Sequence, residues 1–337
     1  MDNPIDALLA EKGVLLADGA TGTNLFAMGL EAGEAPELWN ETAPEKITAL
    51  HQGFVDAGAD IILTNSFGGT RHRLKLHHAQ DRVHELNKRA AELARAVADR
   101  AGRPVIVAGS VGPTGELLEP LGAMTYGEAV ASFAEQIEGL KAGGADVAWI
   151  ETMSAPEEIR AAAEAAVKAG LPYTYTGSFD TAGRTMMGLP PEAIHDVGEQ
   201  MTVRPVAVGA NCGVGAADIL ASLLDMSAAR PDATIIVKGN CGIPEFRGTE
   251  IHYSGTPDLM ADYARLAVDA GARIVGGCCG TSFEHLAAMR AAIDSHRKGE
   301  RPSVETIQAR IGPLRNKLAS QSGSEPAGRR ERRRTRN

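Results

Sequence analysis

Aromatic side chains are scarce in this chain: tryptophan, tyrosine and phenylalanine together make up 4% of its 337 residues. Single-stranded nucleic acids are usually held by aromatic rings that stack on the bases, so such a surface is not expected here. Long apolar runs are also missing, since no stretch approaches the roughly 18 to 20 residues that span a bilayer. Residues 1–6 are acidic and lack the basic region and apolar run of a secretory signal. We therefore expect a cytoplasmic protein that binds neither membrane nor single-stranded nucleic acid.

Charge divides the chain into two unequal parts. The formal net charge is -9, but residues 313–337 hold eight basic and two acidic side chains, which leaves a charge of -15 on the rest. An acidic body repels phosphate backbones, which argues against any nucleic acid as partner. The 313–337 segment has no hydrophobic period and is rich in Ser, Gly and Arg, a composition typical of disorder. We expect a folded domain over residues 1–312 and a disordered Arg-rich tail over residues 313–337.

Short apolar, β-branched runs alternate with helical patterns along most of the chain, which indicates parallel βαβ units. Eight strands are predicted, at residues 14–18, 60–64, 104–108, 146–150, 172–176, 205–209, 234–238 and 273–276. Helices are predicted at residues 44–57, 82–100, 126–142, 156–169, 216–228, 257–270 and 283–296. Eight β/α units in about 300 residues predict an α/β fold, a single (β/α)8 TIM barrel. Its active site is expected at the carboxyl ends of the strands.

Polar and reactive side chains gather directly after these strands, where a barrel predicts a common rim. Those after the first four strands are Asp18, Gly19, Asn65, Phe67, Ser110 and Glu151. The cysteines all follow the last three strands: Cys212, Cys241, and the adjacent Cys278 and Cys279. Inert core thiols would also have fallen in the helices or at the closed end of the barrel. This placement therefore predicts a reactive site at the rim.

Cysteines on the rim of a cytosolic barrel are expected to bind metal or react rather than to form disulfides. Strands six and eight are second neighbours around the barrel, so Cys212 can meet Cys278 and Cys279. Three thiolates without a fourth protein ligand are typical of a catalytic zinc site with one open position. The spacing is not that of a zinc finger, and buried inert thiols are the alternative. Cys241 is interpreted as a packing residue beside the site, with a resting-state ligand as its alternative.

Six short segments carry a resemblance to a known family: DGATGT at 18–23, TNSF at 64–67, GSVGP at 109–113, IET at 150–152, GANC at 209–212 and GGCCGT at 276–281. In order and spacing they resemble the homocysteine S-methyltransferase family, over residues 10 to 300 or so. That family includes betaine:homocysteine methyltransferases, S-methylmethionine-dependent enzymes and the homocysteine-binding module of cobalamin-dependent methionine synthase. The resemblance implies Zn2+ held by Cys212, Cys278 and Cys279. It also implies methyl transfer to the thiolate of homocysteine, giving methionine.

The resemblance assigns roles to the polar rim as well. Glu151 is expected to accept a hydrogen bond from the homocysteine ammonium, the alternative being a charge at a helix N-terminus. Asp18 and Gly19 are expected to contact the substrate, the alternative being a simple Asp-Gly turn. Ser110 and the amides near Gly19 are candidates for the substrate carboxylate. Asn65 and Phe67 complete the expected substrate-binding set.

The methyl donor is expected to be a small onium compound, because one barrel has no room for folate or cobalamin domains. Aromatic faces bind quaternary ammonium groups, and Trp39 is the preferred candidate, with Phe67, Tyr126 or Phe26 beside it. Animal betaine enzymes carry a tyrosine where this chain has Gly68. Glycine betaine is placed first, a sulfonium such as S-methylmethionine or dimethylsulfoniopropionate second, and the methyl group of a separate corrinoid protein third.

A different class of enzyme stays open, namely a TIM-barrel aldolase or synthase that uses Asp18, Glu151 and a Schiff base on Lys238. This class needs no metal, so the zinc content distinguishes it from a methyltransferase. One histidine cluster lies in a basic surface segment and is interpreted as solvated charge: His72, His77 and His78. The sequence leaves the oligomeric state open, with a homo-oligomer as one outcome.

Overall fold

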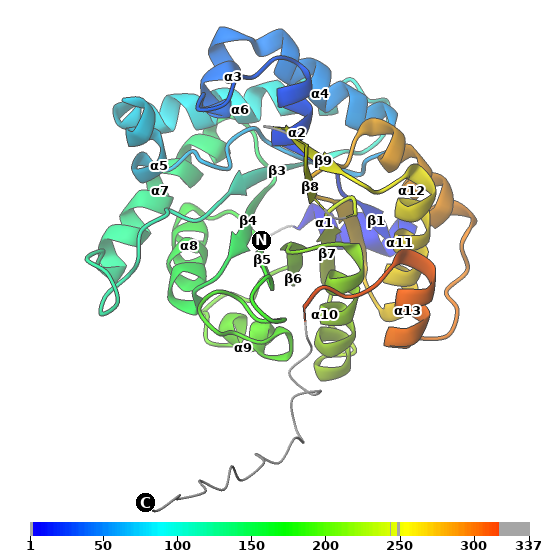
Figure 1. The fold of residues 1–337 in the computed structure, drawn as a ribbon. Coiled ribbons are helices and arrows are strands. Elements are labelled where there is room, and N and C mark those ends of the chain that lie inside the picture. The colour runs from blue at the N-terminus through cyan, green and yellow to red at the C-terminus, as the bar shows by residue number, and fades with distance from the viewer. Residues whose placement is uncertain (1–2, 243, 248–249, 317–337) are drawn as a thin grey trace, which may run out of the picture.

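The structure is a computed structural model that describes residues 3–242, 244–247 and 250–316. Eight parallel strands form one sheet in the order β1-β10-β7-β6-β5-β4-β3-β2. Their bounds are β1 Leu15–Leu16, β2 Ile61–Leu63, β3 Ile106–Val111, β4 Val147–Met153, β5 Tyr173–Gly177, β6 Ala207–Cys212, β7 Ile235–Gly239 and β10 Ile274–Gly277. A bridge between Ala17 and Ile61 joins the first and last strands of this order, so the sheet nearly closes (Figure 1). The predicted TIM barrel is confirmed.

Helices surround the strands (Figure 1). The longer ones are α4 Pro44–Asp56, α6 Val83–Ala98, α7 Tyr126–Ala142, α8 Pro156–Ala169, α10 Ala216–Ala229, α11 Pro257–Ala270 and α12 Phe283–Ser295. Shorter helices lie in the connections: α2 Thr21–Ala27, α3 Trp39–Thr42, α5 Arg71–Leu74, α9 Ile194–Glu199, α13 Val304–Ile311, and the 3-10 turns η1 Pro36–Leu38, η2 Lys75–His77, η3 Gln80–Arg82 and η4 Pro191–Ala193. Local signals define the helix ends: a capping box joins Thr125 and Glu128 at the start of α7, and Gly170 ends α8 in a left-handed conformation.

The predicted helices lie within two residues of the observed ones, whereas most strands continue further at their carboxyl ends than predicted. Three polar positions that were expected just after a strand lie inside one: Ser110 in β3, Glu151 in β4 and Cys212 in β6. The prediction ended each strand where the apolar run ended. Backbone pairing continues past that point, as between Ser110 and Trp149. These side chains are therefore held by the sheet itself, which is stiffer than a loop.

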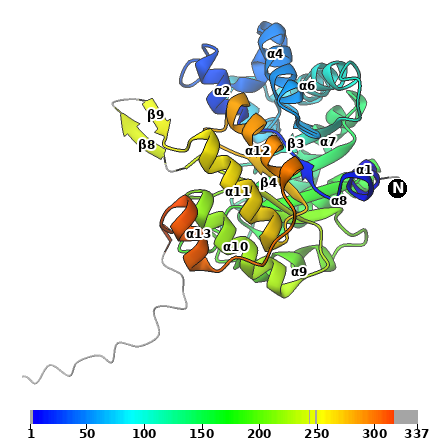
Figure 2. The ribbon, with the colours of Figure 1, turned by 90° about the vertical axis from the view of Figure 1, so that its right-hand side faces the viewer.

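One end of the barrel interior is closed by the first helix, α1 Pro4–Lys12. Ile5, Leu8 and Leu9 of α1 pack with the inward side chains of the strands, including Val147 and Trp149 of β4. All five side chains are at least 95% buried. Figure 2 shows α1 on one side of the barrel and a projecting hairpin on the other. The reactive rim therefore lies at the end that α1 leaves open.

That hairpin was not predicted from the sequence. It consists of the antiparallel strands β8 Pro244–Arg247 and β9 Glu250–Tyr253, inserted between β7 and α11. It extends beyond the barrel at the rim (Figure 2). In the described part of the chain, no helix is both long and apolar enough to cross a membrane.

The last described residues are fixed to the barrel. The backbone N–H groups of Arg315 and Asn316 donate hydrogen bonds of 2.8–3.0 Å to the carboxylate of Asp218, in the first turn of α10. The Asn316 side chain also donates to the carbonyl of Phe179 at 3.1 Å. Most of the predicted tail, residues 317–337, lies outside the described residues.

Candidate metal centre and substrate site

Three of the four cysteines converge at the rim. The sulfur atoms of Cys212, Cys278 and Cys279 all lie within 4.8 Å of one another. Cys212 ends β6, and the other two follow β10, with β7 between these strands in the sheet. Among the described residues this is the one group of Cys, His, Asp or Glu side chains with the spacing to hold a metal ion. Three soft thiolates with room for a fourth ligand are a donor set that zinc accepts.

The backbone holds these cysteines in a demanding conformation. Cys212 has a φ of 63°, in the left-handed region that side chains other than glycine seldom adopt. The N–H of Cys278 donates to the carbonyl of Gly239 at 2.7 Å, and that of Cys279 donates to Oδ1 of Asn240 at 3.1 Å. Strain of this kind persists where surrounding contacts enforce it, and it concentrates at functional sites.

Without a cation, the three thiols disfavour ionisation. A hydrogen bond with Cys278, together with burial, raises the pKa of Cys212 to about 12. A hydrogen bond with Cys212, together with burial, raises the pKa of Cys279 to about 11. A divalent cation among the three sulfurs reverses this balance, because metal coordination deprotonates thiols outright. The cluster is therefore built to be charged only when a cation is present.

A buried set of charged groups lies next to the sulfurs. Oδ1 of Asp18 and Nζ of Lys238 form an ion pair at 2.6 Å, and Oδ2 of Asp18 accepts the N–H of Leu63 at 2.7 Å. Burial raises the pKa of Glu151, opposed by the charge of Lys238 and by the hydroxyl of Ser110. Ser110 donates to Oε1 of Glu151 at 2.6 Å. Because Lys238 is paired with Asp18, the carboxyl of Glu151 is available for a cationic group of a substrate.

Asn211, which precedes Cys212, links the sulfurs to β4. Its Oδ1 accepts the N–H of Thr152 at 2.8 Å and the hydroxyl of Thr176 at 2.6 Å, while its Nδ2 donates to Oγ1 of Thr152 at 2.7 Å. Thr152 has a φ of 62°, a rare value for a β-branched residue. The register between β4 and β5 shifts at this point. Asn211 therefore stabilises the irregular end of β4 that follows Glu151.

The other predicted rim residues differ in what they can contact. Gly19 has a steric role, since a Cβ atom there would lie 2.6 Å from the carbonyl oxygen of Thr281. Asn65 is buried, and its Nδ2 donates to Pro36 and Asn40, so its amide joins two loops. Phe67 is 38% exposed at the rim. Of these predicted substrate contacts, Phe67 is the side chain that the structure presents to solvent.

Trp39, the predicted donor-binding residue, lies in the hydrophobic core at 8% exposure. The ammonium of Lys46 sits 4.3 Å from its ring centroid. A lysine of this chain therefore occupies a position that a methylated cation would need. The nearby Gly68 donates its N–H to Oε1 of Glu37 at 2.6 Å, and a Cβ atom at residue 68 would come within 2.9 Å of that oxygen. A side chain at residue 68, such as the tyrosine of the animal betaine enzymes, would require the Glu37 carboxylate to move.

Cys241 lies beside the sulfur cluster and not in it. Its side chain is 1% exposed, and its N–H donates to the carbonyl of Cys279 at 2.9 Å. Burial raises the pKa of its thiol to about 12. The structure thus places Cys241 in packing contact with the loop that carries Cys279.

Sequence reasoning missed Tyr253, at the end of β9, whose ring lies against Gly280, the residue after Cys279. A signal for it exists in the sequence. Residues 239–256 separate a predicted strand from a predicted helix, and connections longer than about 12 to 15 residues are commonly functional. This length indicates an insertion at the rim without revealing which of its side chains reaches the cysteines.

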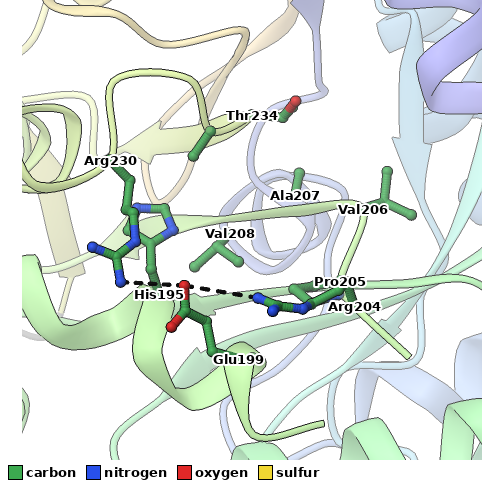
Figure 3. A pocket seen from close by; sticks show the side chains of 11 residues that line it. His195, Glu199, Arg204, Pro205, Val206, Ala207, Val208, Arg230 and Thr234 are labelled. Carbon is green, nitrogen blue, oxygen red and sulfur yellow. Dashed lines mark hydrogen bonds and ion pairs between the residues drawn. The ribbon is translucent and has the colours of Figure 1, made fainter. Parts of the chain in front are cut away.

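A separate pocket of about 290 Å³ lies at the start of β6 and β7 (Figure 3). Arg204 and Arg230 both pair with Glu199 at its edge, at 3.7 and 3.2 Å. His195 also lines this pocket. The pocket lies at the amino ends of the strands and no cysteine lines it, so it is separate from the rim. It contains none of the predicted site residues.

Comparison with known proteins gives a consistent result. The family described as homocysteine S-methyltransferase matches residues 15–293. Methionine synthases of Mycobacterium tuberculosis and Mycobacterium leprae are 31% and 30% identical over 88% and 90% of this chain. The chain spans 26% of the length of each of these relatives. The metallated form of the homocysteine methyltransferase MmuM from Escherichia coli superposes with a TM-score of 0.71, at 27% identity, over 86% of this chain and 99% of that one.

Proposed function

From the fact that this chain belongs to the homocysteine S-methyltransferase family, we propose that it methylates the sulfur of homocysteine to give methionine, with zinc as its metal. One observation carries the proposal: three cysteine sulfurs within 4.8 Å of one another share a rim with the buried carboxyl of Glu151. A thiol substrate that is also an amino acid needs both features. The metallated MmuM structure supports a metal in a relative of this chain.

The residues of this chain fit zinc. Cys212, Cys278 and Cys279 would hold it and leave one position for an incoming sulfur, as in catalytic zinc sites. When bound, zinc supplies the positive charge that removes the proton of a thiol near neutral pH, although a free thiol has a pKa near about 8.5. The irregular backbone at Cys212 and the Asn240 contact to Cys279 position the sulfurs before any substrate arrives.

Glu151 would receive the ammonium of homocysteine. Its carboxyl is buried, and Ser110 orients it through the hydroxyl that donates to Oε1. Asp18 and Lys238 neutralise each other, so the ammonium meets one uncompensated acidic group rather than a balanced pair. The substrate sulfur then attacks the methyl carbon of the donor. A carbon–sulfur bond forms, and the electron pair of the broken bond leaves with the nitrogen or sulfur of the donor.

We propose a small onium donor, with glycine betaine as the first compound to test and S-methylmethionine and dimethylsulfoniopropionate next. The burial of Trp39 and the Gly68–Glu37 contact weaken the case for a betaine cage built on Trp39. Phe67 offers an exposed ring at the rim instead. The third donor to test is a methyl group carried by a separate corrinoid protein, because the relatives of this chain include methionine synthases.

The aldolase alternative meets an obstacle at Lys238. Burial by itself lowers the pKa of this amine, but the charges of Asp18 and Glu151 and the hydrogen bond to Asp18 outweigh burial and raise it. Schiff-base formation needs an unprotonated amine. An ammonium held at 2.6 Å by a carboxylate is therefore a poor nucleophile, and Lys238 serves better as a counter-charge.

The test is a donor screen combined with elemental analysis. Purified protein is expected to contain about one zinc per chain, and to convert homocysteine to methionine with at least one of the three donor classes. A protein that binds no zinc and turns over no donor would contradict the proposal. If methionine forms only when a methylated corrinoid protein is added, homocysteine remains the methyl acceptor and the proposed onium donor is wrong.

A further inference from the structure

Two charged side chains lie directly above the apolar layer of the barrel interior. Ile236 of β7 and Trp149 of β4 belong to the cluster that packs against α1. Side chains two residues apart on a strand share one face, so Lys238 and Glu151 also point into the barrel, one layer closer to the rim. The ammonium of Lys238 lies 6.0 Å from the centroid of the Trp149 ring. An acid and a base therefore form the floor of the open end.

The structure leaves a fixed path for the stem of this lysine. Lys238 of β7 pairs with Gly276 of β10, and a Cβ atom at residue 276 would lie 2.9 Å from Cγ of Lys238. A larger residue at position 276 would displace the stem close to its backbone, where it cannot swing aside. Gly276 also precedes Cys278 by two residues. The ammonium is thus held at a set position next to the strand that leads into the cysteine pair.

The ammonium of Lys238 has more hydrogen-bond donors than acceptors around it. A lysine ammonium carries three N–H groups. Within the part of the chain that the structure describes, it donates one hydrogen bond, to Oδ1 of Asp18 at 2.6 Å, and its side chain is 3% exposed. A donor that is buried without an acceptor costs free energy, and a ligand that supplies the acceptor removes that cost. Two N–H groups of Lys238 therefore remain for an anionic group that enters the site.

The uncharged donors expected to bind the substrate carboxylate already have partners. The hydroxyl of Ser110 donates to Glu151, and its N–H donates to Oγ1 of Thr64 at 3.0 Å. In the first rim loop, the N–H of Ala20 donates to the carbonyl of Thr281 at 3.1 Å. A substrate carboxylate would have to break these hydrogen bonds, whereas the buried ammonium on the floor can accept it without losing a partner.

Building on the proposed methyltransferase function, we propose that Lys238 binds the α-carboxylate of homocysteine while Glu151 binds its ammonium. The two charged groups of an amino acid are attached to one carbon, so their partners must lie close together. The charges of Lys238 and Glu151 act on each other, which agrees with that proximity. Asp18 orients the lysine and balances its charge in the free protein. Lys238 is thus a specificity-determining residue that selects thiols with a carboxylate.

The test measures the binding of three thiols to the zinc-loaded protein by titration calorimetry. Homocysteine carries both charged groups, 3-aminopropane-1-thiol lacks the carboxylate, and 4-sulfanylbutanoate lacks the ammonium. Lys238→Met keeps most of the stem and removes the charge. Because this change leaves Asp18 buried without its partner, a second variant, Lys238→Met with Asp18→Asn, removes both charges together. The control is Lys12→Met, since Lys12 of α1 also pairs at 2.6 Å with a buried aspartate, Asp60, but at the closed end.

We expect wild type and Lys12→Met to bind homocysteine about a hundredfold more tightly than 3-aminopropane-1-thiol. In both Lys238 variants this ratio should fall to about threefold or less, because the carboxylate has lost its partner. Both thiols carry the ammonium, so the ratio is independent of any contact between that group and Asp18. A ratio in the double variant equal to that of wild type would overturn the proposal and reduce Lys238 to a structural counter-charge.

The third thiol separates the two charged partners. Affinity for 4-sulfanylbutanoate should fall in the Lys238 variants and stay within about twofold of wild type in Glu151→Ala. The opposite pattern would also overturn the proposal. Wild-type protein that takes up no zinc or binds none of the three thiols would refute the proposed function, and this inference with it, before any variant is compared.

Discussion

The two ends of the barrel interior are built from the same strands and have opposite chemistry. Along β4 the inward side chains are Val147 and Trp149 toward the closed end and Glu151 at the open end. At the closed end they pack with Ile5 and Leu8 of α1. At the open end Glu151 accepts a hydrogen bond from the hydroxyl of Ser110, and the charge of the buried Lys238 acts on its carboxyl. Position along a strand therefore decides whether an inward residue stabilises the fold or is available for chemistry.

The open end also carries local conformations that the closed end does not need. Cys212 and Thr152 both have positive φ, and the pair Asp18–Lys238 is at least 97% buried. Each of these features opposes folding, because strained backbone and desolvated charge both raise the free energy of the native state. Packing at the closed end, where Ile5 and Trp149 have no exposure, offsets that opposition. The division predicts that substitutions at the two ends have separable effects.

The largest effect is expected at the sulfur cluster. Replacing Cys278 with Ala should remove zinc and lower activity by about a thousandfold or more, because it leaves two sulfurs of the one three-ligand group found among the described residues. Elemental analysis and the methionine assay measure the two losses, and circular dichroism checks the fold. The matched control is Cys241→Ala, which removes a thiol from the same rim and should retain zinc. Full activity in zinc-free Cys278→Ala would refute the metal mechanism.

The second effect concerns Glu151. Replacing it with Ala should weaken homocysteine binding by about 2 to 4 kcal/mol, because the substrate ammonium is left without its partner in a desolvated pocket. Titration calorimetry measures the affinity. An unchanged affinity would reduce Glu151 to a structural residue at the end of β4.

The pH dependence of binding gives an independent check on the same residue. Burial raises the pKa of Glu151 above its usual 4.5, so its carboxylate is lost as the pH falls through a value higher than that of a free glutamate. Homocysteine affinity should therefore be full above this raised pKa and decline below it. Glu151→Gln should bind weakly and without that dependence, and an identical pH profile in wild type and variant would assign the titration to another group.

A smaller effect is expected at the closed end. Ile5→Val removes one methyl group from a fully buried side chain of α1 and should lower the free energy of unfolding by about 1 kcal/mol. Urea unfolding measures the change. The KM values for homocysteine and donor should stay within twofold of wild type, since α1 lies at the end opposite the rim. A clear rise in either KM would show that the two ends are coupled.

The smallest effect is expected at Trp39. Its burial and its contact with Lys46 mean that Trp39→Phe should change the donor KM by less than about twofold while lowering stability. Steady-state kinetics with the active donor measures this. A donor KM about tenfold higher in Trp39→Phe, with homocysteine KM unchanged, would show that the ring binds the donor after all.

The family resemblance and the alternation of strands and helices could be predicted from the sequence, because both depend on short segments. An apolar run of four or five residues indicates a buried strand wherever it occurs, and the helix ends at Thr125 and Gly170 are local signals. Strand ends were harder to place. Ser110 and Cys212 continue their strands through backbone pairing with neighbours far along the chain.

What the sequence determined by itself is the barrel, its open rim and the identity of the three cysteines on it, since periodicity and order along the chain carry that information. The tertiary structure alone decided which rim residues face one another. Trp39 is buried beneath the Lys46 ammonium, Lys238 is paired with Asp18, and Tyr253 of the inserted hairpin packs against Gly280. These pairings join residues 7 to 220 positions apart. Spacing along a chain does not encode such contacts, because they depend on how loops from separate strands pack above the closed barrel.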